Sequence, residues 1–179
     1  HYMLKEIVEQ PDAMRQSLSG RTDPATGTVH LEHELGPLSG IQTVVLIGCG
    51  TSHYAASYAA GVIESYGVHA EAVIASEYRD RPHWDTSDTL MIAVTQSGET
   101  ADTLSALREA SRRGARTLAV TNTVGSTAAR ECDHAFYIRA GPEIGVAATK
   151  TFASQQAALN LLTLATAGGH ARAIVPALR

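Results

Sequence analysis

The chain has 179 residues, of which 44% are hydrophobic, and a formal net charge of -4 at pH 7. This is enough chain for one sizeable core, and the acidic balance argues against nucleic-acid or membrane-surface partners, which are recognised through basic clusters. No apolar stretch is long enough to span a bilayer, so we expect no membrane partner. The two cysteines, Cys49 and Cys132, lack metal-ligand spacing and any disulfide framework, so we expect a cytoplasmic protein without a bound metal.

The first 40 residues predict helices followed by a polar segment. Apolar residues recur at steps of three and four from His1 to Ser19, with a gap around Pro11. This pattern predicts a short helix to about Gln10 and a second helix with Pro11 near its first turn. The segment 20–40 is rich in Thr, Asp, Pro and Gly and predicts a loop that contains no more than a weak turn.

From residue 41 onward, continuous apolar runs alternate with helical patterns. Continuous runs are typical of strands that are covered on both faces of a parallel sheet. The predicted strands are 43–47, 70–75, 89–94, 116–121 and 134–138. The predicted helices are 52–66, 100–113, 126–131 and 151–167, the last ending at Gly168-Gly169. This order predicts an α/β fold with a doubly wound, five-stranded parallel sheet of the flavodoxin-like type, flanked by helices.

Two loops that follow predicted strands carry the same chemistry. Gly48-Cys49-Gly50-Thr51-Ser52 follows the first strand, and Thr95-Gln96-Ser97-Gly98-Glu99-Thr100 follows the third. Each leads into a predicted helix, whose first N–H groups and partial positive charge attract an anion. The Ser and Thr hydroxyls add donors that rotate to suit a phosphate. Because ligands of such folds bind at the carboxyl ends of the strands, these loops predict a phosphate site held without Lys or Arg.

Both loops also have a simpler interpretation. For the first loop it is a tight turn from strand to helix with capping hydroxyls. This loop also matches the start of a dinucleotide-binding pattern, but His53 stands where that pattern has its third glycine. Ser97 is a preferred N-cap residue, which is worth about 1 kcal/mol to a helix. However, the hydroxyls are more numerous than capping requires. Charge-assisted hydrogen bonds to a phosphate are worth roughly 1.5–3 kcal/mol each, so a few of them give useful affinity.

A third loop, 141–150, follows the fifth predicted strand. Its glycines would bring the backbone close to a ligand in the cleft, whereas the simpler interpretation is a connection that caps the last helix. Glu77, Glu99 and Glu143 are the carboxylates nearest the predicted cleft and are candidate general bases by position. Charge compensation at a helix start explains Glu99 equally well.

Three motifs in this order resemble the sugar isomerase (SIS) domain family: residues 49–52, 95–103 and 143–150. Residues 1–11 and 75–79 narrow the resemblance to the first SIS repeat of the glutamine–fructose-6-phosphate aminotransferases, and the likeness covers nearly the whole chain. The resemblance implies roles for individual residues. A sugar phosphate would be bound by Cys49 and Gly50 along the sugar, by the backbone of Val146 at its hydroxyl end, and by Thr51, Ser52, Thr95, Gln96, Ser97 and Thr100 at the phosphate.

By the same resemblance, the ligand is fructose 6-phosphate or glucosamine 6-phosphate and no cofactor is needed. Enzymes of this group make glucosamine 6-phosphate from fructose 6-phosphate and glutamine, the first step of amino-sugar nucleotide biosynthesis. Their nucleophilic cysteine, isomerase base and ring-opening histidine are absent here. We therefore expect residues 1–179 to form a single SIS domain, with a helical segment 1–40 and an α/β core 41–179. It would be a fragment that lacks the glutaminase domain and the second repeat, and it would be inactive alone.

Self-association as a homodimer is expected, because the predicted helix over 155–167 carries Ala and Leu residues that would be exposed. Two other functions compete with this interpretation. SIS domains also occur as non-catalytic sugar-phosphate sensors in transcription regulators. A nucleotide-cofactor oxidoreductase is disfavoured by His53.

Overall fold

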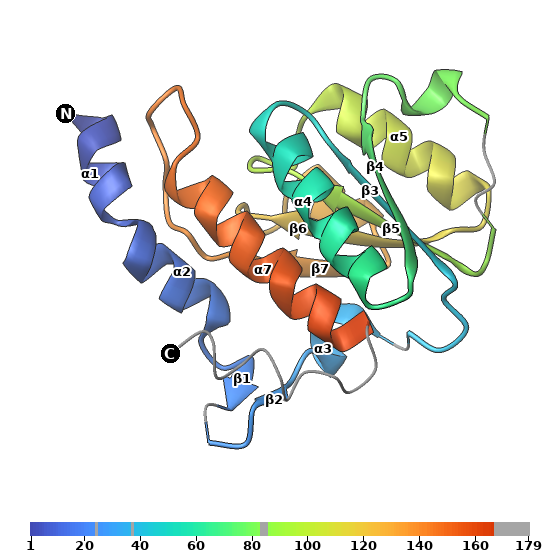
Figure 1. Ribbon diagram of the computed structural model, residues 1–179. Coiled ribbons are helices and arrows are strands. Elements are labelled where there is room, and N and C mark those ends of the chain that lie inside the picture. Colours follow the sequence, from blue (N-terminus) through green and yellow to red (C-terminus); the bar gives the residue numbers. More distant parts are fainter. Residues whose placement is uncertain (24, 37, 83–85, 167–179) are drawn as a thin grey trace.

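The computed structural model describes residues 1–23, 25–36, 38–82 and 86–166. Its centre is a five-stranded parallel sheet with the order β4-β3-β5-β6-β7 (Figure 1). The strands are β3 (Thr43–Gly48), β4 (His69–Ile74), β5 (Thr89–Val94), β6 (Arg116–Thr121) and β7 (His134–Tyr137). This order confirms the predicted flavodoxin-like sheet, and each predicted strand boundary lies within one residue of the observed one.

Helices cover both faces of the sheet (Figure 1). The helices α4 (Thr51–Ser65) and α7 (Lys150–Thr166) share one core with the sheet, into which Leu46 and Ile92 point. On the other face, α5 (Ala101–Arg112) packs on Ile47 and Met91, and the short α6 (Thr127–Glu131) packs on β6. Neighbouring strand residues therefore point into different cores, which explains why the strands are apolar without alternation.

Two further helices lie at the start of the chain: α1 (Tyr2–Val8) and α2 (Gln10–Leu18). They meet at Glu9, and Pro11 lies in the first turn of α2 as predicted, where its missing N–H costs nothing. α2 packs along α7 and so covers the side of α7 that faces away from α4 (Figure 1).

The segment 20–40 is more ordered than the sequence predicts. A short antiparallel ribbon of β1 (Thr22–Asp23) and β2 (Thr28–Val29) precedes the helix α3 (Glu32–Leu35), so the loop prediction was wrong here. The anchor is Arg21, which is 2% exposed, pairs with Glu34 and lies 3.8 Å above the ring of Phe136. These contacts join residues far apart in sequence, and two-residue strands are too short to show a periodic pattern.

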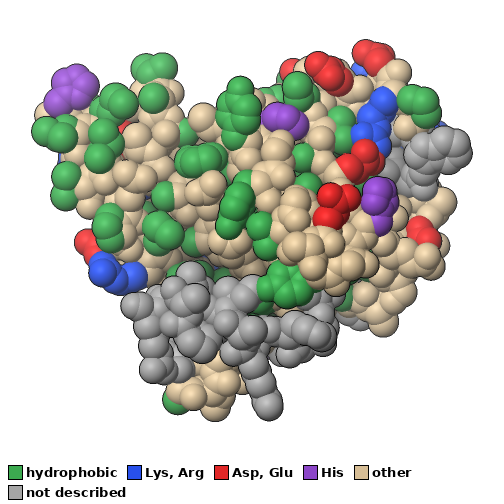
Figure 2. All heavy atoms as spheres, in the orientation of Figure 1, with side chains coloured by type: hydrophobic (Ala, Val, Ile, Leu, Met, Phe, Trp, Pro, Cys, Tyr) green, Lys and Arg blue, Asp and Glu red, His purple; other side chains and the backbone are tan. Residues whose placement is uncertain are grey.

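The predicted exposure of the last helix is also wrong. Leu159, Leu161 and Leu162 are each 1% exposed, because α7 lies between α2 and α4. The predicted glycine cap, Gly168-Gly169, lies outside the described residues. Exposed apolar side chains gather instead over α1, where Figure 2 shows a green cluster beside the N-terminus. Within the part of the chain that the structure describes, none of the helices combines the length and the apolar character needed to cross a membrane.

Candidate functional site

A cavity of about 310 Å³ opens at the carboxyl ends of β3 and β5. These are the strands between which the chain reverses its direction across the sheet, the place where ligands of doubly wound folds bind. The cavity is lined by Cys49, Gly50, Thr51, Ser52, Val94, Thr95, Gln96, Ser97, Thr100 and Thr103. The structure therefore brings together every site residue predicted from the sequence except Val146.

Two helices begin at this cavity without a side-chain cap. The N-cap of the 15-residue α4 is Gly50, whose φ of 54° lies in the region that favours glycine, and it has no side chain to offer. The N-cap of the 12-residue α5 is Thr100, whose hydroxyl makes no capping hydrogen bond. Both helix N-termini therefore direct N–H groups and partial positive charge at one small space.

The hydroxyls of the β5 loop accept hydrogen bonds from the backbone. Oγ1 of Thr95 accepts the N–H of Gly98 at 3.1 Å, and Oγ of Ser97 accepts the N–H of Glu99 at 3.2 Å. Ser97 is thus not the N-cap of α5, as the simpler interpretation had it, but stabilises the loop before that helix. Because each oxygen is held as an acceptor, its own O–H remains available to donate to an anion.

Ser52 is oriented by a residue that the sequence analysis did not single out. Nε2 of Gln155, on α7, donates to Oγ of Ser52 at 3.0 Å, and both residues are buried. With the oxygen engaged as an acceptor, the hydroxyl hydrogen of Ser52 is directed elsewhere, and the cavity adjoins this residue. Only the packing of α7 on α4 reveals this pair, because 103 residues separate its members.

Gly98 permits the tight fold of the β5 loop. Its φ is +71°, and a Cβ built at this position would lie 2.1 Å from Oγ of Ser126. The carbonyl of Gly98 also accepts the N–H of Ala128. The loop is therefore pressed against the start of α6, which holds Thr95 and Ser97 at the cavity.

None of the three candidate bases, Glu77, Glu99 and Glu143, is among the described residues that line the cavity. The carboxylate of Glu99 accepts the backbone N–H of Thr127 at 2.8 Å, a hydrogen bond that lowers the pKa of Glu99. Glu99 thus supports the start of α6 rather than the start of α5, which follows it. Glu143 accepts hydrogen bonds from Thr149 and Thr151 at the start of α7. Among the described residues, those that line the cavity include no carboxylate, imidazole or cationic side chain.

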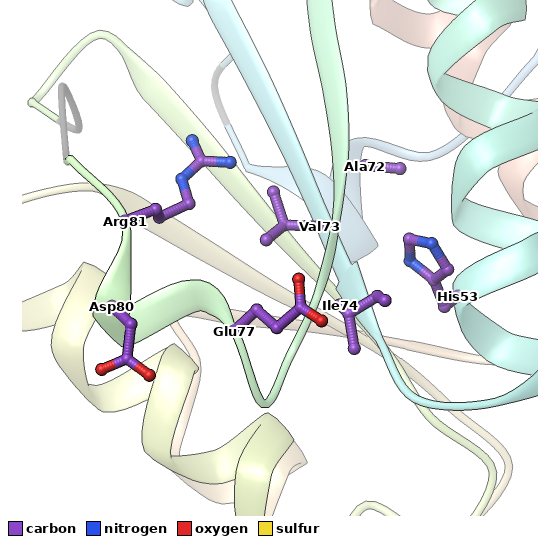
Figure 3. Close-up of a pocket in the computed structure, with 7 residues that line it drawn as sticks. All are labelled: His53, Ala72, Val73, Ile74, Glu77, Asp80 and Arg81. Carbon is purple, nitrogen blue, oxygen red and sulfur yellow. The ribbon is translucent and has the colours of Figure 1, made fainter.

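Glu77, the third candidate base, lies in a different and larger cavity of about 570 Å³. Figure 3 shows its carboxylate and the imidazole of His53 on either side of the end of β4. Asp80 and Arg81 also line this space, and Arg81 is paired with Glu71. The carboxylates of Glu77 and Asp80 repel a phosphate, because like charges repel each other. The smaller cavity at the ends of β3 and β5 is therefore the better anion site.

Val146 lies in the 138–149 loop, between β7 and α7, and outside the cavity lining. Its side chain is fully exposed, and so is most of the side chain of Ile144. Two carboxylates accept hydrogen bonds from the backbone of this loop: that of Glu143, within the loop, and that of Glu6, on α1. The contact of Val146 with a sugar therefore remains a prediction.

The two cysteines differ in their surroundings. Cys49 lines the cavity, with Sγ 3.9 Å from Oγ1 of Thr103. Cys132 directly follows α6, and burial raises the pKa of its thiol to about 12. Both are free, and the described residues contain no group of three His, Cys, Asp or Glu side chains placed to hold a metal ion.

The chain belongs to the SIS domain family, whose model matches residues 38–165. It is 50% identical over its whole length to glutamine–fructose-6-phosphate aminotransferase (isomerizing) from Halobacterium salinarum and 52% identical over 92% of its length to the enzyme of that name from Symbiobacterium thermophilum. The chain spans 31% and 28% of these relatives. Among solved structures, it matches the C-terminal domain of glucosamine-fructose-6-phosphate aminotransferase from Francisella tularensis. The TM-score is 0.92 and the identity 34%, over 99% of this chain and 53% of that one.

Proposed function

We propose that the cavity at the ends of β3 and β5 binds the phosphate group of fructose 6-phosphate or glucosamine 6-phosphate. The observation that carries this proposal is the meeting of two uncapped helix N-termini within a ring of hydroxyls. A phosphate accepts several hydrogen bonds at once and is favoured by the positive ends of helices. Fructose 6-phosphate appears in the names of these relatives.

The cavity offers enough donors to bind a phosphate without a cation. Thr51, Ser52, Thr95, Ser97 and Thr100 all contribute side chains to its lining. If three such hydrogen bonds form, at roughly 1.5–3 kcal/mol each, their sum exceeds the stabilisation needed for a millimolar dissociation constant, about 4 kcal/mol. The phosphate-binding roles of these residues and of Gln96, and the sugar contacts of Cys49, Gly50 and Val146, belong to this proposal.

We infer that the larger protein is a glutamine–fructose-6-phosphate aminotransferase and that this chain is its first sugar isomerase domain. The identities of 50% and 52% to enzymes of that name support this inference. The larger protein would then make glucosamine 6-phosphate at the start of amino-sugar nucleotide biosynthesis. The two free cysteines of this chain are consistent with the reducing cytoplasm.

Turnover is expected to require groups beyond this cavity. Moving a proton between sugar carbons needs a positioned base, and the lining described above provides none. We therefore propose that the chain by itself binds the sugar phosphate without converting it. We also propose a homodimer, with the exposed apolar side chains of α1 rather than those of α7 at the contact. Sedimentation as a monomer at high concentration would contradict the dimer.

A non-catalytic sugar-phosphate sensor is the second candidate, because a cavity that holds phosphate without a base also suits a sensor. The adjoining sequence discriminates between the two functions. A glutaminase domain upstream favours the aminotransferase, whereas a helix-turn-helix favours the sensor.

Calorimetric titration tests the binding proposal. The chain should bind fructose 6-phosphate and ignore unphosphorylated fructose. The double variant Thr51→Ala/Ser97→Ala should lose at least tenfold in affinity, because it removes one donor from each loop. Ser57→Ala is the matched control, since this exposed serine of α4 bonds to its own helix. Equal binding of fructose, or an unchanged affinity in the double variant, would overturn the proposal.

A further inference from the structure

A buried carboxylate joins the first helix to the 138–149 loop. Glu6, on α1, is 3% exposed, and its Oε1 accepts the backbone N–H of Ile144 at 2.6 Å and that of Gly145 at 3.1 Å. Its Oε2 lies at the same distance from the N–H of Gly145. An acidic residue hidden from water is costly unless it is hydrogen-bonded, and here its described partners are backbone groups of a loop 138 residues away.

The loop is shaped to receive this carboxylate. A Cβ built on Gly145 would lie 2.4 Å from Oε2 of Glu6, so a side chain at this position would push the carboxylate away from its present place. A second attachment lies beside it, where Nζ of Lys150 is 2.8 Å from a carboxylate oxygen of Glu9. The side chain of Lys150 is only 6% exposed. Glu6 therefore binds the loop and Glu9 binds the beginning of α7, so the start of the chain holds both in place.

The other end of the loop is tied to the candidate phosphate site through Asn122. The side chain of Asn122 accepts the N–H of Ala140 at 2.8 Å and donates to the carbonyl of Gly141 at 2.7 Å. The backbone N–H of Asn122 donates to the carbonyl of Gln96 at 3.1 Å, and Gln96 lines the cavity. Hydrogen bonds at both ends of the loop, joined by its backbone from residue 141 to 144, thus connect α1 through Asn122 to the β5 loop. Figure 1 shows the loop standing between α1 and the sheet.

We infer that Glu6 is a positioning residue for the sugar-phosphate site, acting from α1 through the 138–149 loop and Asn122 on the β5 loop. This inference rests on the proposed function for the identity of the ligand. Its physical basis is that Glu6 takes the place of water as the acceptor for the N–H groups of Ile144 and Gly145. If these hydrogen bonds are lost, the loop is free to move, and so is its other end, which Asn122 binds. A displacement of α1 then shifts the β5 loop at the cavity. Any chain that is attached before α1 can alter the sugar-phosphate affinity in this way.

The test combines ligand affinity with amide hydrogen exchange on the full chain. Glu6→Gln keeps the shape of the side chain but sets an amide NH2 against the loop N–H groups. Gly145→Ala attacks the same contact from the loop side and serves if the first variant folds poorly. Asp12→Asn is the matched control, because this exposed carboxylate pairs only with the neighbouring Arg15 in the described structure. We expect the two test variants to bind fructose 6-phosphate about fivefold more weakly, and the control to bind it unchanged.

A double-mutant cycle with Asn122→Ala separates positioning from a general loss of stability. In the Asn122→Ala background, Glu6→Gln should cause no further loss of affinity, because the connection is already cut. Faster exchange at Gly145 with unchanged affinity would overturn the inference, as would fully additive effects. If the wild-type chain binds no sugar phosphate, the proposed function fails, and exchange at Asn122 decides the coupling alone. Faster exchange there in Glu6→Gln supports the coupling, and unchanged exchange refutes it.

Discussion

Gln155 donates a hydrogen bond to the hydroxyl of Ser52, and this buried pair fixes the first turn of α4 against α7. The pair orients the Ser52 hydroxyl, because an oxygen that accepts from Gln155 has its own hydrogen left for a different acceptor. The helix α7, which is distant from Ser52 in the sequence, therefore helps to orient a donor at the candidate phosphate site.

Replacing Gln155 with Leu should weaken fructose 6-phosphate binding about three- to tenfold, because the Ser52 hydroxyl loses its orientation. Calorimetry measures the change. The neighbouring half-buried Gln156→Leu serves as the control and should leave the affinity unchanged. Equal affinities for the wild-type chain and Gln155→Leu would show that Ser52 is not held by this contact.

Cys49 should be protected from alkylation by the bound ligand. Iodoacetamide should modify Cys49, which lines the cavity, and leave Cys132 intact, because burial raises the pKa of the Cys132 thiol to about 12. Fructose 6-phosphate should slow the modification of Cys49 several-fold, as read by mass spectrometry of the digested chain. Unphosphorylated fructose is the control ligand. An unchanged rate at saturating fructose 6-phosphate would place the ligand away from Cys49.

Gly98→Ala should destabilise the chain by about 2 kcal/mol or more, since the positive φ and the clash with Ser126 both oppose a Cβ. Urea denaturation measures the loss. Gly61→Ala in α4 is the matched control, because a Cβ at that site meets nothing within 4 Å and alanine favours helices. This control should gain about 0.5–1 kcal/mol. A stable Gly98→Ala variant would mean that the β5 loop has room to move.

Glu143 should contribute stability that disappears in acid. Burial raises the pKa of Glu143, but the hydrogen bonds from Thr151 and Thr149 outweigh it and hold this pKa below its ordinary value of 4.5. Ionised Glu143 therefore stabilises the fold above pH 4.5, and this contribution is lost as the pH falls through the lowered pKa. Glu143→Gln should lower the unfolding temperature by about 4 °C at pH 7.

The same substitution should have a smaller effect in acid, because wild-type Glu143 loses its charge once the pH falls through its lowered pKa. Thermal unfolding at pH 7 and at a pH below that pKa measures the difference. Glu64→Gln, which replaces an exposed carboxylate on α4, is the control and should change stability little at either pH. A constant difference between wild type and Glu143→Gln across this range would remove Glu143 as the acid-sensitive group.

The sheet was predictable because local pattern and burial agree along it. The three central strands, β3, β5 and β6, are runs of mostly β-branched and aliphatic residues covered on both faces, so their bounds follow from the sequence. The cavity was predictable for a related reason, since strand order places the loops after β3 and β5 side by side. The position of Val146 did not follow, because it depends on Glu6 and Asn122 rather than on the loop itself.

What the sequence could not reveal rests on long-range side-chain contacts. Arg21 orders the 20–40 segment by pairing with Glu34 and stacking on Phe136, and neither contact leaves a periodic pattern. The burial of α7 was missed for a similar reason. Its Ala and Leu residues face both α2 and α4, and a helix that is apolar on several sides looks exposed until both partners are placed.

Backbone amide shifts during titration with fructose 6-phosphate locate the ligand most directly. If the uncapped starts of α4 and α5 hold the phosphate, the amides of Thr51 and Ser52 and those of residues 97–101 should shift together and saturate at one affinity. Inorganic phosphate should move the same amides at higher concentration. Shifts confined to His53, Glu77 and Asp80 around the larger cavity, or no saturating shift at all, would contradict a phosphate site between β3 and β5.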